Sequence, residues 1–171
     1  MGTDFFDFVE HWATIYKPMQ HESGYRSKNQ RFFLTDTYMG MADFMSQIQP
    51  KSSPCIIMES NQEGYLGTGI DHPHYSIYFM VKSSSMVDGR SAMYAKKEAK
   101  DHLEKFVVYL RREQYNENPL LKNITINENI PYQTVGPFYN GWFGVMIQLD
   151  DSVQYQNCVS DDDYVIIEEG Q

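Results

Sequence analysis

The sequence predicts an α+β domain, in which one long amphipathic helix covers one face of a mostly antiparallel sheet of about four to five strands. Three stretches support this fold class. Asp88–Tyr115 places apolar side chains at helical spacing, Gly141–Leu149 alternates apolar side chains on one face, and His74–Val81 is a β-prone run. The short connections between most of the expected strands favour antiparallel pairing, and N-terminal helices precede the sheet.

Two helices are expected before the sheet. Thr3–Tyr16 and Thr35–Ile48 each begin with a threonine, a good capping residue, and each repeats apolar residues at helical spacing. Between them, Lys17–Gln30 is polar and aperiodic, and we expect a loop there. An alternative for the second region is a short strand at Arg31–Leu34 that precedes the helix.

Three strands should follow in close succession. Cys55–Glu59 is short, apolar and β-prone, Tyr65–Ile70 is an alternating stretch loosened by glycines, and His74–Val81 is the clearest strand of the three. We expect turns at Asn61–Gly64 and at Asp71–Pro73, because both segments are rich in residues that favour turns.

The long helix is the most clearly defined element. Asp88 is the expected N-cap, and the sequence NENP that begins at Asn116 ends the pattern. Charged residues occupy most of the rest of the cylinder, where pairs such as Asp101–Lys105 have the spacing of ion pairs. The stripe expected to face the sheet consists of Ala92, Ala95, Ala99, Leu103, Phe106, Val107 and Leu110.

The chain should close with further strands. Lys122–Asn127 alternates isoleucine with polar residues, and Pro131–Pro137 is either a loop or a broken edge. Gly141–Leu149 is the strongest strand signal in the chain, and we expect it in the interior of the sheet. These elements form a single domain over residues 1–150, followed by an acidic C-terminal tail over 151–171.

Charge is distributed unevenly between these parts. Residues 1–122 hold all 14 Lys and Arg, whereas residues 123–171 hold none and carry eight of the 23 acids of this chain of net charge −9. A segment without cations is poorly suited to grip nucleic acid. Near the end, the apolar run Tyr164–Ile167 is bracketed by acids; it is either a frayed tail or a strand added to an edge on another subunit.

Candidate metal ligands and nucleophiles are few. Asp71, His72 and His74 could share one face of a strand and hold a metal ion, but Pro73 disrupts the strand geometry, and we favour histidines in a turn. Cys55 is expected to be buried in a strand and Cys158 to be exposed without an activating neighbour. No catalytic signature occurs, so we expect no enzyme, no cofactor and no metal.

The long helix also carries a basic face, formed by Lys96, Lys97, Lys100, Lys105, Arg111 and Arg112. As a nucleic-acid site it lacks interleaved aromatic residues and is interrupted by acids. A solvated face is one alternative. Another is an intersubunit contact, in which this face meets the acidic C-terminal segment of a neighbour.

The order of elements resembles that of the tail terminator family of tailed bacteriophages and, more loosely, of small head–tail connector proteins. The likeness is carried by PCIIMES, HYSIYFMV, the helix Asp88–Tyr115 and the closing VGPFYNGWFGVMIQL. The resemblance implies a structural virion protein, assembled in the host bacterial cytoplasm, that forms a homo-oligomeric ring, usually a hexamer in that family. Such a ring caps the tail tube, joins it to head-connector proteins and lets DNA pass without specific binding.

For such a ring we expect two kinds of surface. An acidic bore would avoid retaining DNA, and the expected oligomer or lumen-facing residues are Lys96, Lys100, Arg111, Arg112, Asp150, Asp151, Asp161, Asp162 and Asp163. The alternative function is a small ligand- or peptide-binding α+β module without catalysis, which would use the sheet face opposite the long helix.

Overall fold

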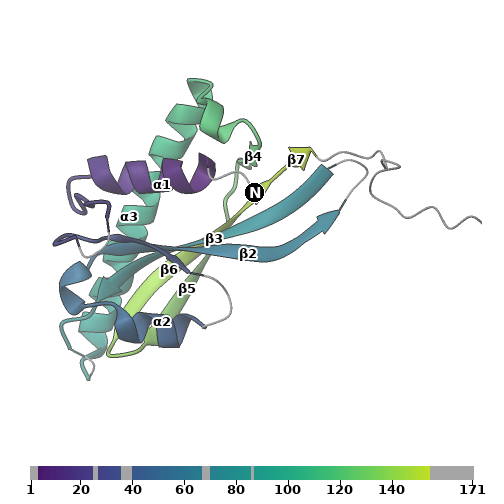
Figure 1. The fold of residues 1–171 in the computed structure, drawn as a ribbon. Helices are drawn as coiled ribbons and strands as arrows, with labels where there is room; N and C mark the ends of the chain where they lie inside the picture. Colours follow the sequence, from purple (N-terminus) through teal and green to yellow (C-terminus); the bar gives the residue numbers. More distant parts are fainter. Residues whose placement is uncertain (1–3, 25–26, 36–39, 67–69, 86, 155–171) are drawn as a thin grey trace, which may run out of the picture.

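The computed structural model describes residues 4–24, 27–35, 40–66, 70–85 and 87–154, and it confirms the α+β class (Figure 1). Within these residues there are three α-helices, two short 3-10 turns and seven strands. In chain order they are α1 (Asp4–Ile15), β1 (Phe32–Thr35), α2 (Met41–Gln47), η1 (Pro50–Ser52), β2 (Cys55–Leu66), β3 (Ile70–Lys82), α3 (Gly89–Tyr115), η2 (Pro119–Leu121), β4 (Ile124–Thr125), β5 (Tyr132–Phe138), β6 (Trp142–Asp151) and β7 (Val153–Gln154).

All seven strands belong to one mixed sheet. Its main path runs β1-β2-β3-β6-β4, while β5 also pairs with β6 and β7 pairs with β3. Every pairing is antiparallel except that of β1 with β2, which is parallel because α2 and η1 form the crossover between these strands. The paired strands β2 and β3 extend beyond the helices as a long arm (Figure 1).

The main core lies between the sheet and the two longer helices. Trp12 of α1 packs edge-on against Phe79 of β3 and Phe106 of α3, with ring centroids 6.1 and 5.2 Å apart. Phe106 is fully buried and its ring lies 5.4 Å from that of Phe79. These aromatic contacts tie α1, α3 and the sheet into one cluster, and burial of the large rings is a main source of its stability.

A second, smaller core lies on the opposite face of the sheet. Neighbouring residues of a strand point to opposite faces, and Ile56 joins the first cluster whereas Ile57 joins the second. The buried members of the second cluster are Met45, Ile48, Cys55, Ile57, Met80 and Trp142. The face opposite α3, expected to be exposed, is therefore covered in part by α2 and its flanking residues.

The long helix forms as the sequence predicts. The Asp88 side chain accepts a hydrogen bond from the backbone N–H of Arg90 at 3.0 Å, as an N-cap does. Its buried residues include most of the expected stripe, and His102 adds to them from the side that faces α1. They are Ala95, Ala99, His102, Leu103, Phe106 and Leu110.

The structure corrects three local predictions. The second helix begins at Met41 rather than Thr35, because Phe32–Thr35 forms the strand β1 that was the alternative. The turns expected at Asn61–Gly64 and Asp71–Pro73 are wrong, since both segments lie within long strands that pair with each other. A register shift between Ser60 and Gly64 accommodates the irregular residues, and cross-strand pairing here overrides weak β-propensity.

The closing elements agree more closely with the prediction. β6 pairs with β3 along its whole length and with β4 and β5 on its other side, so it lies inside the sheet. The strand expected over Lys122–Asn127 is reduced to Ile124–Thr125. Pro131–Pro137 is an edge strand rather than a loop, and its pairing shifts register between Val135 and Phe138.

Candidate functional site

The strand β5 leaves one margin of the sheet open. It pairs with β6 on one side, and among the described residues no strand pairs with its other side. Most of its residues are exposed. Gly136 has a φ of +96°, and a Cβ there would lie 2.6 Å from the carbonyl oxygen of Trp142, so the irregular end of this edge requires glycine. An edge of this kind offers backbone donors and acceptors to another chain.

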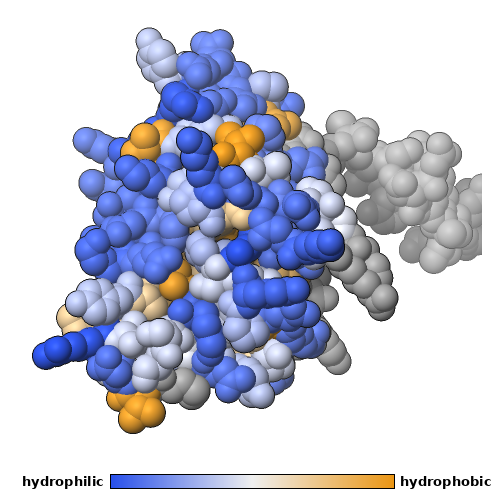
Figure 2. Space-filling view, turned by 90° about the vertical axis from the view of Figure 1, so that its left-hand side faces the viewer, coloured by the Kyte–Doolittle hydropathy of each residue, from blue (hydrophilic) through white to orange (hydrophobic). Residues whose placement is uncertain are grey.

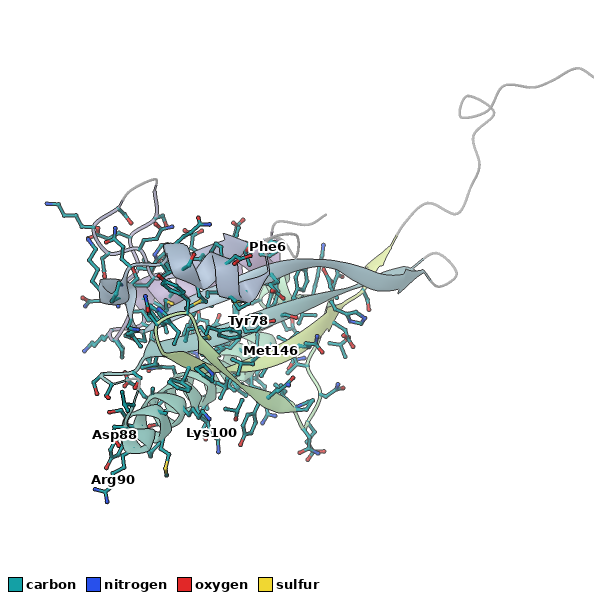
Figure 3. All side chains as sticks on the ribbon, turned by 90° about the horizontal axis from the view of Figure 1, so that it is seen from below. Phe6, Tyr78, Asp88, Arg90, Lys100 and Met146 are labelled. Carbon is teal, nitrogen blue, oxygen red and sulfur yellow. The ribbon has the colours of Figure 1, made fainter. Side chains whose placement is uncertain are left out.

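Two lysines of α3 lie beside this edge over aromatic rings. The Lys96 Nζ lies 5.5 Å from the ring centroid of Phe143 in β6, and the Lys100 Nζ lies 5.2 Å from that of Tyr132 in β5. Figure 3 shows Lys100 projecting from α3 on the side of β5. Hydrogen bonding to Tyr132 raises the pKa of Lys100, so its ammonium stays charged. We call Lys96, Lys100, Tyr132 and Phe143 the α3–β5 surface.

The sequence missed this surface because its parts are distant in the chain. The basic face of α3 has no aromatic residue interleaved with its lysines, yet β5 and β6 bring Tyr132 and Phe143 beneath them. A cation held over a ring in this way is stabilised by about 0.5–1 kcal/mol at an exposed site. The cations on this surface are therefore held in place before any partner binds.

The remaining expected basic residues are already engaged within the chain. Arg111 donates from Nη2 to the carbonyl oxygen of Glu128, and Arg112 pairs with Glu113 at 3.0 Å. The guanidinium of Arg112 also lies 4.9 Å from the ring centroid of Tyr109, which is directed toward α1. The two arginines thus lie on different sides of α3 and do not form one patch.

The ion pairs along α3 differ from the expected ones. Lys97 bonds Asp101 at 2.8 Å and Lys100 approaches Glu104 at 3.6 Å, whereas the expected partner of Asp101 was Lys105. Both observed pairs have the i,i+4 spacing and are exposed, so each contributes little to stability.

The acidic candidates separate into two environments. Asp150 is half exposed, and its Oδ1 lies 2.6 Å from the Nδ1 of His74. Asp151 is buried, where it accepts hydrogen bonds from the Tyr75 hydroxyl at 3.1 Å and from the Ser152 backbone N–H. Asp151 therefore stabilises the chain itself rather than facing outward. Asp161, Asp162 and Asp163 lie outside the described residues.

The candidate metal ligands lie in a strand. Asp71, His72 and His74 belong to β3, which corrects the prediction that these histidines occupy a turn. Among the described residues, no group of three or more His, Cys, Asp and Glu has the arrangement of a metal site. Cys55 is fully buried as predicted, and burial raises the pKa of its thiol, so it stays protonated and unreactive. Cys158 lies outside the described residues.

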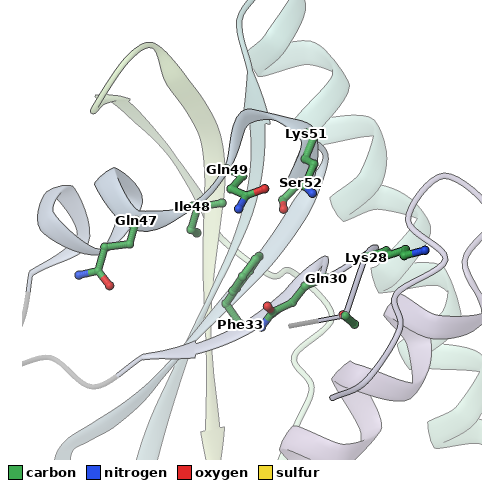
Figure 4. Close-up of a pocket in the computed structure, with 9 residues that line it drawn as sticks. Lys28, Gln30, Phe33, Gln47, Ile48, Gln49, Lys51 and Ser52 are labelled. Carbon is green, nitrogen blue, oxygen red and sulfur yellow. The ribbon is translucent and has the colours of Figure 1, made fainter. Parts of the chain in front are cut away.

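A depression of about 550 Å³, which the sequence did not predict, lies between β1 and the α2–η1 segment (Figure 4). Its size is that of a small-ligand or peptide site, and we call it the β1 groove. One wall is formed by Ser27, Lys28, Gln30 and Phe33, and the other by Gln47, Ile48, Gln49, Lys51 and Ser52. It escaped prediction because the crossover between β1 and β2 folds over the sheet only in the tertiary structure.

Another hollow lies elsewhere on the described part of the surface. A smaller depression of about 260 Å³ lies at the C-terminal end of α3, between Gln114 and Ile124. The side of the molecule seen in Figure 2 is mostly hydrophilic, with apolar residues in isolated spots. None of the helices in the described part of the chain is both long and apolar enough to cross a bilayer.

Comparison with known proteins supplies no family for this chain. No protein-family model matches its sequence, and no curated protein matches it either. Any function must therefore be argued from the surfaces described above and from the order of the elements.

Proposed function

We propose that this chain is a structural subunit of a phage or prophage tail, tail-terminator-like, that assembles with copies of itself into a ring. The observation that carries the proposal is the open β5 edge flanked by the α3–β5 surface. An unpaired edge next to ordered cations and rings is suited to recognising another protein chain.

The proposed ring requires a contact between two different surfaces of the subunit. β1 and β5 are both terminal strands among the described residues, and they differ in direction, length and neighbouring side chains. A contact between the β5 edge of one copy and a different surface of the next is heterologous, and such contacts close into a ring when the rotation permits. In the proposed role the ring caps the tail tube and meets the head-connector proteins in the virion.

The proposed bore lets DNA pass without holding it. Asp150, half exposed at the end of β6, is the residue of the expected acidic lining that the described part of the chain presents to solvent. Carboxylates around the bore would give DNA none of the counterion release that drives binding to cations. Asp151 is excluded from the proposed lining because it is buried.

The assembly is tested by size-exclusion chromatography with light scattering and by negative-stain imaging of the full chain. The wild-type protein should form rings, and the double variant Lys96→Glu with Lys100→Glu should lose them because it removes the cations that flank the β5 edge. Lys105→Glu is the matched control, since Lys105 is exposed on another side of α3. A wild-type chain that stays monomeric at all concentrations and on tail tubes would refute the proposal.

The bore is tested separately in the phage. Replacing Asp150 with lysine should leave the ring intact and impair DNA ejection, because DNA would be retained electrostatically. Normal infectivity of this variant would contradict the acidic lining while leaving ring formation untouched.

A second candidate function is a ligand- or peptide-binding module without catalysis. The β1 groove favours it, because a hollow of about 550 Å³ is large enough for a small molecule or a peptide segment. This function predicts a monomer that binds its ligand with one-to-one stoichiometry. Mass measurement therefore separates the two candidates before any ligand is known.

A further inference from the structure

The β1 groove has the features of a site for an acidic apolar segment. Phe33 and the nearly buried Ile48 give it an apolar part, and the exposed Lys28 and Lys51 stand on opposite walls. Among the described residues that line it there is no Asp or Glu. Figure 4 shows these side chains arranged around the hollow, with Lys28 and Lys51 contributed by different segments. The groove thus combines positive charge with apolar surface.

The edge of β1 adds backbone groups beside the groove. The backbone N–H of Ile56 donates to the carbonyl oxygen of Arg31 at 2.7 Å, which starts the parallel ladder between β1 and β2. Because alternate residues of a strand point their backbone groups to opposite sides, the N–H and C=O of Leu34 point away from β2. An extended segment lying along β1 therefore finds partners for its own backbone.

The C-terminal segment of this chain has the complementary pattern. Residues 161–163 are three aspartates, Tyr164–Ile167 is apolar, and two glutamates follow at 168 and 169, with no Lys or Arg anywhere after residue 122. An apolar centre flanked by acids matches an apolar groove flanked by lysines. The α3–β5 surface is a poorer acceptor, because its lysines are held over rings and Glu104 lies beside Lys100.

The C-terminal segment and the β1 groove lie at different places in the sheet, which favours a second copy as the source of this segment. The segment leaves from β7, which pairs with Ile70 and Asp71 of β3, opposite the far end of β2. The groove lies beside β1, which pairs with the start of β2 at Ile56–Glu59. At about 3.3 Å per residue, the distance along β2 between these two places is roughly 30 Å.

Reaching its own groove would require an almost straight chain. From Gln154 to Tyr164 the chain can span at most about 36 Å, and it would have to follow the molecular surface to the opposite end of the sheet. Figure 1 shows β7 and α2 at opposite ends of the molecule. A neighbouring copy placed at the end of the β2–β3 arm avoids this requirement, and the resulting contact is head-to-tail.

We infer that residues 161–169 of one copy occupy the β1 groove of the next, so that each subunit donates a segment and accepts one. This inference rests on the proposed self-assembly and names the contact that joins successive subunits. It also assigns the intersubunit role of the acidic segment to the groove rather than to the basic face of α3. The aspartates lie near Lys28 and Lys51, and Tyr164–Ile167 covers Phe33.

The direct test is zero-length carbodiimide crosslinking of the full chain, prepared as an equal mixture of ¹⁴N- and ¹⁵N-labelled protein. The inference predicts crosslinks from Lys28 or Lys51 to carboxylates of residues 161–169, in isotopically mixed pairs that only two copies can give. Lys28→Glu with Lys51→Glu removes the reacting amines, so its effect is read on assembly instead: rings should be lost, because like charges then face each other. Lys105→Glu should leave assembly unchanged.

A second variant distinguishes loss of the intersubunit contact from loss of the fold. Combining Lys28→Glu and Lys51→Glu with Asp161→Lys and Asp163→Lys should restore assembly, which a misfolded acceptor cannot do. The inference is overturned if the crosslinks are only intramolecular, or if rings of unchanged mass form when both lysines are reversed. In the latter case the proposed ring function stands. A strictly monomeric wild-type chain overturns the ring function together with the inference.

Discussion

Phe106 connects the long helix to both the N-terminal helix and the sheet, so Phe106→Ala tests the packing on which the fold depends. The side chain is fully buried, and its ring lies 6.5 Å from that of Phe8, 5.2 Å from Trp12 and 5.4 Å from Phe79. Truncation of a buried phenylalanine costs about 3–5 kcal/mol. Three ring contacts are lost together, each worth about 0.5–1.5 kcal/mol, so we expect a value near the upper end of that range.

The effect should be large relative to the stability of the whole chain. A domain is stable by about 5–15 kcal/mol, so the variant would lose a substantial part of its free energy of unfolding. At about 2–4 °C per kcal/mol for a chain of this size, Tm should fall by roughly 10 °C or more. Urea denaturation followed by circular dichroism, at a concentration where the oligomeric state is the same for both proteins, measures the difference.

The control is Val108→Ala on the same helix. Val108 is 68% exposed, so its truncation should change the free energy of unfolding by no more than about 0.5 kcal/mol. If Phe106→Ala cost less than about 1.5 kcal/mol, the packing of α1 and α3 against the sheet described here would be wrong.

Three further changes test other parts of the molecule. Gly144→Ala in β6 would place a Cβ against the carbonyl oxygen of Phe79 and the sulfur of Met80, and should destabilise the protein by about 1–3 kcal/mol in denaturant. Gly89→Ala, where a Cβ meets nothing within 4 Å, should be nearly neutral. Tyr75→Phe removes the hydroxyl that donates to the buried Asp151 carboxylate and should lower the free energy of unfolding by about 1–3 kcal/mol. The control Tyr139→Phe, at a residue 54% exposed, should leave it almost unchanged. Equal effects of the two variants would contradict the buried role of Asp151. Burial lowers the pKa of His102 below its ordinary value of 6.5, while Glu98 and Asp101 act in the opposite direction. Near and below pH 6.5 the unfolded chain therefore binds more protons than the folded chain. Stability should therefore fall as the pH is lowered through 6.5, and His102→Gln, measured by Tm between pH 7 and 5, should show a smaller fall; an unchanged pH profile would exclude the His102 contribution.

Sequence reasoning located the long helix and the interior strand because their signals are local. Asp88 caps the helix through its own side chain, and Ala95, Leu103 and Phe106 face the sheet because 3.6-residue periodicity alone places them on one side. In β6, alternation separates Phe143 from Trp142, and the two residues belong to the two different cores, one on each face.

Sequence reasoning failed where a residue's conformation depends on a distant partner. Pro73 and Gly64 favour turns in isolation, yet they face each other across β2 and β3, and the paired residues before and after them compensate for their poor β-propensity. The burial of His102 was not predicted, because nothing in its own helix indicates that the Tyr16 hydroxyl lies 2.9 Å from its Nδ1.

What the sequence by itself determined is the α+β class, the apolar stripe of α3 and the charge asymmetry, since periodicity and composition are properties of the chain alone. Only the tertiary structure decided where the surfaces lie. Lys100 meets Tyr132, and Lys28 and Lys51 line the same β1 groove, because strand pairing and the β1–β2 crossover bring together segments that no local pattern relates. Contacts between distant segments are fixed by burying apolar surface on both faces of one sheet, which is a property of the whole fold.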